Sequence, residues 1–186
     1  MSERPTRADL IAANGRAILD VIAPGLRVLI SGINPGLYSA ATGHHFARPG
    51  NRFWPALHLS GFTPRLLAPS EQQSLLEFGI GITNVVARGS ARADELTRAE
   101  LIAGGAALAA KVHQYAPAWL AILGVGAYRD AFGRAGAVVG PQDQTIGTTR
   151  VWVLPNPSGL NAHYPLPRLV EEFARLKAAA AAQKAN

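Results

Sequence analysis

Cysteine is absent from the 186 residues of this chain. Its absence excludes disulfide bonds, thiolate catalysis, cysteine-ligated zinc and iron–sulfur clusters. Long hydrophobic runs are absent too, since no apolar stretch reaches the roughly 18 residues that a membrane-spanning helix needs. The first 25 residues contain acids and no continuous apolar segment, so we expect no signal peptide and no membrane association. These absences together predict a cytoplasmic protein.

Acidic residues and lysine are scarce. Twelve Asp and Glu stand against 18 Lys and Arg, which gives a net charge of +6, and fifteen of the basic residues are arginine. Arginine suits a polyanion, because its guanidinium group binds a phosphate through two donors. A genome composition that favours Arg and Ala would produce the same bias, so charge alone leaves nucleic-acid binding open.

Alternating patterns predict the fold. Four short apolar runs bounded by Gly or Pro predict buried strands at 27–31, 81–86, 119–124 and 150–155. Helical patterns lie around and between them at 51–60, 70–78, 97–115, 126–133 and 166–183. The helix over 97–115 has a capping box, Thr97 and Glu100, at its start. This alternation predicts a three-layer α/β/α fold with a mostly parallel central sheet.

The chain reads as a single domain over residues 1–186, since no linker or internal repeat divides it. An amphipathic pattern over 6–22 predicts an N-terminal helical extension, residues 1–23. The alanine-rich end, residues 178–186, is expected to fray.

Polar, irregular segments follow three of the predicted strands: 32–51, 87–95 and 156–165. Because functional groups of parallel sheets gather at the carboxyl ends of the strands, we expect these segments to meet at one rim. Asn34 and Asn156 each precede a proline directly after a strand. An uncharged amide there can hold a water molecule or the edge of a base. The alternative is that each Asn only caps a turn.

Several familiar sites are excluded. The segment after the first strand has no lysine and so is no phosphate-binding loop, and neither G-x-G-x-x-G nor G-x-S-x-G occurs. The adjacent His44 and His45 cannot both face one ion from a strand, so no metal site is predicted.

Three motifs carry a resemblance. In order, GINPGL, TGHHFARPGNRFW and LPNPSGL closely resemble the mismatch-specific uracil/thymine DNA glycosylases, the thymine-DNA-glycosylase-like branch of the uracil-DNA glycosylase superfamily. The similarity extends over roughly residues 24–175. It implies a monofunctional enzyme of base excision repair that flips uracil out of a G·U mismatch and hydrolyses its glycosidic bond, leaving an abasic site.

The same resemblance implies no metal, no cofactor and, as partner, double-stranded DNA with G·U or G·T mismatches. We expect a monomer that acts at the bacterial nucleoid. Thymine and modified cytosines are further candidate bases. The competing interpretation is a non-catalytic nucleic-acid-binding module on the same fold.

The resemblance also implies roles for single residues. Asn34 would position the attacking water, and Phe46 would stack on the flipped base. Leu160, with Ser158 and Gly159, would form the wedge that enters the vacated stack. Further substrate contacts are implied for Ile33, Tyr38, Ser39, Asn84 and Asn156. The chain departs from many bacterial relatives at Ala162, where they carry a basic residue.

The source of catalytic charge is a separate question, because an amide such as Asn34 is a poor base. Asp94 lies in the second rim segment, and we predict that its carboxylate takes part in catalysis. Its alternative is a solvated residue near the start of the helix over 97–115. None of the three lysines lies in a rim segment, so no Schiff base and no strand cleavage are expected.

Overall fold

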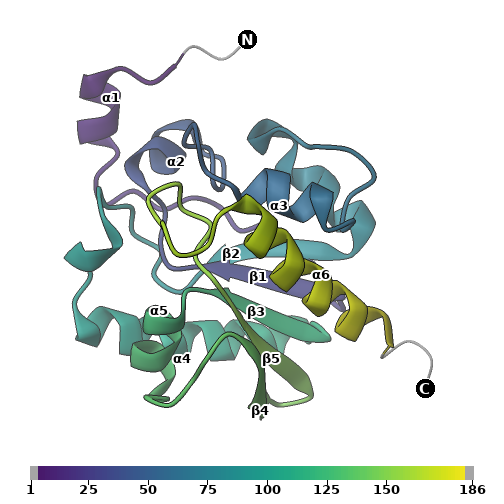
Figure 1. Ribbon diagram of the computed structural model, residues 1–186. Coiled ribbons are helices and arrows are strands. Elements are labelled where there is room, and N and C mark those ends of the chain that lie inside the picture. Colours follow the sequence, from purple (N-terminus) through teal and green to yellow (C-terminus); the bar gives the residue numbers. More distant parts are fainter. Residues whose placement is uncertain (1–3, 183–186) are drawn as a thin grey trace.

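A five-stranded sheet forms the centre of the computed structural model, which describes residues 4–182 (Figure 1). The strand order is β2-β1-β3-β5-β4, and all neighbours run parallel except β4, which is antiparallel to β5. The strands are β1 (Val28–Gly32), β2 (Ile80–Asn84), β3 (Trp119–Leu123), β4 (Gly140–Ile146) and β5 (Thr149–Leu154). The predicted mostly parallel α/β fold is confirmed.

Helices cover both faces of this sheet (Figure 1). The α-helices are α1 (Arg7–Ala12), α2 (Leu37–Thr42), α3 (Phe53–Leu59), α4 (Arg98–Tyr115), α5 (Val125–Phe132) and α6 (Leu166–Ala182). Two 3₁₀ helices, η1 (Pro69–Phe78) and η2 (Ala93–Glu95), are also present in the described residues. Thr97 and Glu100 form the predicted capping box at the start of α4.

Two hydrophobic clusters hold the layers together. Alternate strand residues point to opposite faces, so Val28 and Ile30 of β1 pack with α3, α6 and η1, while Leu29 packs with α4 and α5. Phe173 of α6 and Tyr128 of α5 are among the largest fully buried side chains. With both faces covered, the central strands present their polar groups only at their ends.

Two elements were missed by sequence reasoning. Strand β4 is an edge strand in which exposure alternates along the chain, and its polar sequence GPQDQTI has no apolar run that would mark it. Helix α2 lies inside the segment expected to be an irregular loop. It is short and ends at Gly43, whose φ of 75° is left-handed.

The two ends also differ from expectation. Only Arg7–Ala12 is helical at the N-terminus, so the predicted helical extension was wrong beyond Ala12. In the segment that follows, Val21 forms an isolated antiparallel bridge to Ile82. Helix α6 continues to Ala182, into the tail expected to fray, and residues 1–3 and 183–186 lie outside the described part. None of the helices between residues 4 and 182 is long and apolar enough to span a membrane.

Candidate active site

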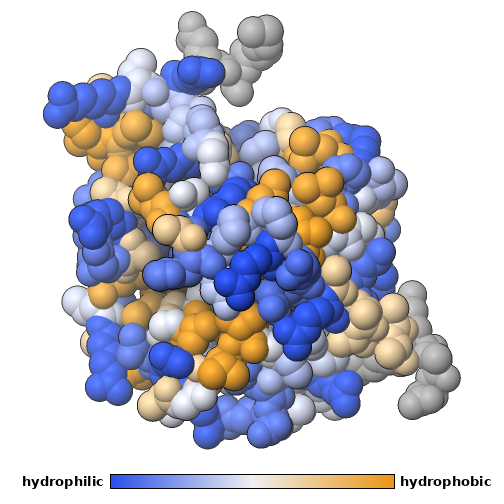
Figure 2. All heavy atoms as spheres, in the orientation of Figure 1, coloured by the Kyte–Doolittle hydropathy of each residue, from blue (hydrophilic) through white to orange (hydrophobic). Residues whose placement is uncertain are grey.

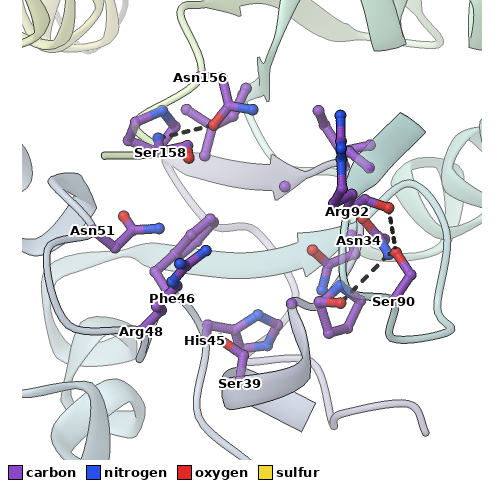
Figure 3. A pocket seen from close by; sticks show the side chains of 18 of the residues that line it. Asn34, Ser39, His45, Phe46, Arg48, Asn51, Ser90, Arg92, Asn156 and Ser158 are labelled. Atoms are coloured by element: carbon purple, nitrogen blue, oxygen red, sulfur yellow. Dashed lines mark hydrogen bonds between the residues drawn. The ribbon is translucent and has the colours of Figure 1, made fainter. Parts of the chain in front are cut away.

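A cavity of about 340 Å³ opens at the carboxyl ends of the parallel strands (Figure 3). The three rim segments predicted from the sequence do meet here. The predicted residues in its lining are Ile33, Asn34, Ser39, Phe46, Asn84, Asp94, Asn156, Ser158 and Leu160. Tyr38 and Gly159 are not part of the lining. Sequence reasoning missed the lining residues Ile18, His45, Arg48, Asn51, Ser90 and Arg92.

The side chain of Asn34 is held in one orientation. Its Nδ2 donates to the Arg88 carbonyl at 3.0 Å and to Ser90 Oγ at 2.8 Å. Ser90 uses its own hydroxyl proton on the carbonyl of Arg92, at 2.7 Å, so it can only accept from Asn34. No residue between 4 and 182 donates to Asn34 Oδ1. The carbonyl half of the amide is therefore the half offered to the cavity.

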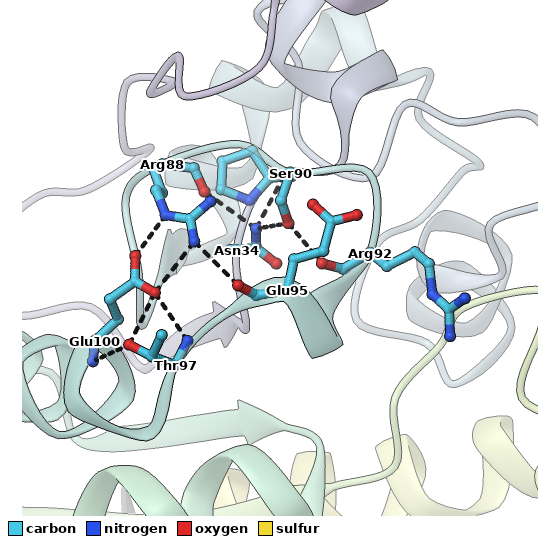
Figure 4. Close-up of polar contacts among 8 residues, drawn as sticks. Asn34, Arg88, Ser90, Arg92, Glu95, Thr97 and Glu100 are labelled. Atoms are coloured by element: carbon cyan, nitrogen blue, oxygen red, sulfur yellow. Dashed lines mark hydrogen bonds and ion pairs between the residues drawn. The ribbon is translucent and has the colours of Figure 1, made fainter.

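A polar network stabilises the loop after β2, which contains the hydrogen-bond partners of Asn34 (Figure 4). The Arg88 guanidinium binds both carboxylate oxygens of Glu100 and donates to the Glu95 carbonyl at 3.2 Å. Glu100 also accepts from the backbone N–H of Thr97 at 2.8 Å. The Arg88 hydrogen bonds, followed by that from Thr97, lower the pKa of Glu100 to about 2. The loop after β2 is thus anchored on the first turn of α4.

Phe46 forms an aromatic wall of the cavity. Its ring stacks on that of the buried Phe53, with centroids 4.0 Å apart and planes at 24°. Its backbone has φ of 53°, a left-handed conformation that costs a non-glycine residue about 1–2 kcal/mol. Gly32 makes the arrangement possible, since a Cβ there would lie 3.2 Å from the Phe46 ring and 2.5 Å from Asn84 Oδ1.

The N-terminal segment supplies a further wall. Ile18 lines the cavity, and the neighbouring Leu19 accepts a hydrogen bond from His45 Nε2 at 3.0 Å. His45 is buried, and burial lowers its pKa below the usual 6.5. Its backbone carbonyl accepts from the Trp54 indole at 3.1 Å. His45 therefore ties the N-terminal segment to α3, a structural role that sequence reasoning did not assign.

The segment after β5 places Asn156 and an exposed leucine at the rim. Asn156 Oδ1 accepts from the Ser158 N–H at 2.9 Å, so Asn156 does cap a turn. Its Nδ2 has no acceptor within residues 4–182 and remains available to the cavity. Leu160 is 79% exposed. Leu160 lies at the mouth of the cavity and belongs to neither of the two hydrophobic clusters.

Asp94 lies at the rim as predicted, in the 3₁₀ helix η2, and its carboxylate forms an ion pair with Arg92. Both side chains are largely exposed, at 62% for Asp94 and 73% for Arg92. Within residues 4–182, no group of three His, Asp or Glu side chains lies close enough to share a metal ion.

The sequence model of the "Uracil DNA glycosylase superfamily" matches residues 19–179, most of the chain. The chain belongs to this superfamily. The solution NMR structure of a "putative Uracil DNA glycosylase" from Methanosarcina acetivorans has the same fold, with a TM-score of 0.60 and 20% sequence identity over 88% of this chain and 98% of that one. Membership of the uracil DNA glycosylase superfamily supports a DNA glycosylase role.

Proposed function

We propose that this member of the uracil DNA glycosylase superfamily is a monofunctional, mismatch-specific DNA glycosylase of the thymine-DNA-glycosylase-like branch, which removes uracil opposite guanine. The observation that carries the proposal is the free Oδ1 of Asn34, which faces a cavity of about 340 Å³. Cavities of this size suit small ligands. Phe46 stands at the same cavity and Leu160 at its mouth.

Base flipping assigns a task to each of these side chains. The target base leaves the duplex and stacks on Phe46, and Leu160 fills the space left in the stack. The Nδ2 group of Asn156 donates to the nucleotide from the opposite rim. Extrusion costs least at a mispair, so a G·U site yields its base more readily than a paired one.

Hydrolysis then follows at the sugar. A water molecule donates a hydrogen bond to Asn34 Oδ1, which turns the water oxygen toward C1′. The bond between C1′ and the base nitrogen breaks, its electron pair leaves with the base, and the water oxygen bonds to C1′. The water loses one proton, which we assign to the Asp94 carboxylate, while the released base is protonated by solvent.

The reaction stops at the abasic site. Strand cleavage by a glycosylase requires an amine that attacks C1′ and forms a Schiff base. The cavity lining, within the described part of the chain, contains no lysine. Lys111 is engaged elsewhere, with Asp20 and with Thr83 Oγ1, the latter at 2.8 Å.

A labelled duplex tests the proposal. A strand with one uracil opposite guanine is incubated with the protein in a chelator, and half of the sample is heated in alkali before electrophoresis. We expect a cleaved strand only after alkali, with much slower product formation from U·A than from G·U. Cleavage before alkali would refute the monofunctional assignment, and equal rates on U·A would refute mismatch specificity. Binding without any product would instead support the non-catalytic module.

A further inference from the structure

Arg52 makes an unusual set of contacts with the segment that carries Leu160. We call residues 157–164 the wedge segment. The Arg52 guanidinium donates to the carbonyls of three of its residues: Ser158, Asn161, at 2.9 Å, and Tyr164, at 2.8 Å. The backbone N–H of Arg52 donates to a fourth carbonyl, that of Pro157, at 3.1 Å. One residue thus binds the wedge segment along its whole length.

The guanidinium group of Arg52 forms no ion pair with a carboxylate in the described part of the chain. Its Nε is buried without an acceptor in that part of the chain. Burying the polar Nε without a hydrogen-bond partner is energetically costly. If this position served only to support the fold, a neutral side chain that donates hydrogen bonds would cost less than the charged Arg52. The positive charge draws carbonyls of the wedge segment inward, while Leu160 stays 79% exposed.

A second contact holds the wedge segment to the same support. A Cβ at Gly159 would lie 2.7 Å from the carbonyl oxygen of Gly50. Gly159 has no positive φ, so closeness to Gly50, and not backbone strain, explains the glycine. The backbone of residues 50–52 therefore fits directly against the wedge segment at two points, through Gly50 and through Arg52.

Arg52 also links the wedge segment to the wall of the cavity. It is the N-cap residue of α3, and the first residue of that helix, Phe53, stacks under Phe46. The wedge segment and the Phe46 ring, which is proposed to receive the flipped base, therefore both contact the start of α3. A displacement of the wedge segment relative to Phe46 would require these hydrogen bonds to break.

We propose that Arg52 is a positioning residue that holds the wedge segment ready for insertion before DNA is bound. The inference rests on the proposed function, because it acts through Leu160. A segment ordered in advance loses less conformational entropy when it enters the duplex, which favours the flipped state. Without Arg52, Leu160 is still present but enters the stack from a loosely held loop.

A double-mutant cycle tests this assignment. Arg52→Gln, Leu160→Ala and the double variant are compared in single-turnover excision from the G·U duplex. Flipping is followed separately by the fluorescence of 2-aminopurine placed beside the target. We expect each single variant to lose about tenfold in rate together with the fluorescence rise, because stacking contacts have this worth. We expect the double variant to be no slower than Leu160→Ala, since both changes remove the same event.

Two further variants make the result decisive. Arg65→Gln removes an exposed arginine paired with Glu71 and should behave as wild type. Gly159→Ala displaces the wedge segment and leaves Arg52 in place. We expect it to reproduce the effects of Arg52→Gln on rate and fluorescence. It replaces Arg52→Gln in the double-mutant cycle if that variant unfolds below the assay temperature. A normal fluorescence rise in both Arg52→Gln and Gly159→Ala would overturn the inference. So would a double variant whose loss in excision rate equals the product of the two single losses. Absence of excision by the wild type would instead overturn the proposed function.

Discussion

Asn34 illustrates how neighbours decide the chemistry of a neutral side chain. An amide offers a donor and an acceptor, and either could face a ligand. The Ser90 hydroxyl and the Arg88 carbonyl occupy the donor half, which leaves the oxygen for water. Such an oxygen orients a nucleophile but does not remove its proton. Asp94 is therefore the side chain whose charge distinguishes two mechanisms.

The pair Asn34→Ala and Asp94→Asn tests these roles. We expect Asn34→Ala to slow single-turnover excision by about 10²-fold, because a misplaced nucleophile has an effect of this size. Asp94→Asn changes only charge, and if Asp94 takes the proton its rate should fall by about 10²–10⁴-fold without loss of DNA affinity.

Asp130→Asn is the matched control. Like Asp94→Asn, it removes a carboxylate that lies near an arginine, here Arg98, but Asp130 does not line the cavity. Its excision rate should equal that of the wild type. A fully active Asp94→Asn protein would show that Asp94 is only a solvated partner of Arg92 at a helix start, and Asn34 would be left as the main reacting side chain.

The loop after β2 depends on the start of α4. The bidentate contact between Arg88 and Glu100 and the capping box at Thr97 join the two, and Arg88 in turn holds Asn34. The Glu100 carboxylate stays ionised far into acid because the Arg88 and Thr97 hydrogen bonds lower its pKa from 4.5 to about 2. A carboxylate with a depressed pKa stabilises the fold above its unfolded-state pKa and loses that effect as pH falls.

Stability measured against pH follows from this shift. We expect Glu100→Gln to have a lower free energy of unfolding than the wild type at pH 7, by an amount that stays constant down to about pH 5. The difference should then shrink as the pH falls through 4.5 toward 2. Urea unfolding at successive pH values measures it. The pKa of Glu71 is also lowered, but Glu71 is present in both proteins, so its contribution cancels from the difference. A difference in the free energy of unfolding that grows in acid would contradict the expected sign.

The surface as a whole is positively charged, with a net charge of +6. Figure 2 shows hydrophilic side chains gathered at the centre of the viewed face, with smaller hydrophobic groups around them. Arg48 and Arg92 are exposed in the lining of the cavity, where phosphates of a bound strand would lie. Phosphate contacts release counterions, so their number appears in the salt dependence of binding.

Binding to a mismatched duplex should therefore weaken as salt rises, with log Kd linear in log salt concentration. Arg48→Gln and Arg92→Gln should each reduce the magnitude of that slope by about 1. Fluorescence anisotropy between 50 and 200 mM salt measures it, a span over which about 6–10 phosphate contacts change affinity by 10³–10⁵. Arg65→Gln should leave the slope unchanged. If it reduces the slope as much as Arg48→Gln and Arg92→Gln do, the slope reflects the net charge of the protein and not phosphate contacts at the cavity.

The main layout was predictable from local patterns. Buried parallel strands consist of short apolar runs, so β1, β2, β3 and β5 were found, and the capping residues Thr97 and Glu100 marked the start of α4. The convergence of the three rim segments also followed, because parallel strands end at one edge of a sheet. The edge strand β4 and helix α2 escaped, since neither carries a distinctive periodic signal within a few residues.

Only the tertiary structure decided the parts of the site that join distant segments. The sequence placed Asn34 and Phe46 at the rim, yet the orientation of Asn34 depends on Ser90, 56 residues away. In the same way, the contacts of Arg52 reach Tyr164 across 112 residues. A hydrogen bond depends on distance and direction between its two groups, and residue type along the chain carries neither. Residue chemistry could therefore be inferred from the sequence, while the partner of each group was settled by folding.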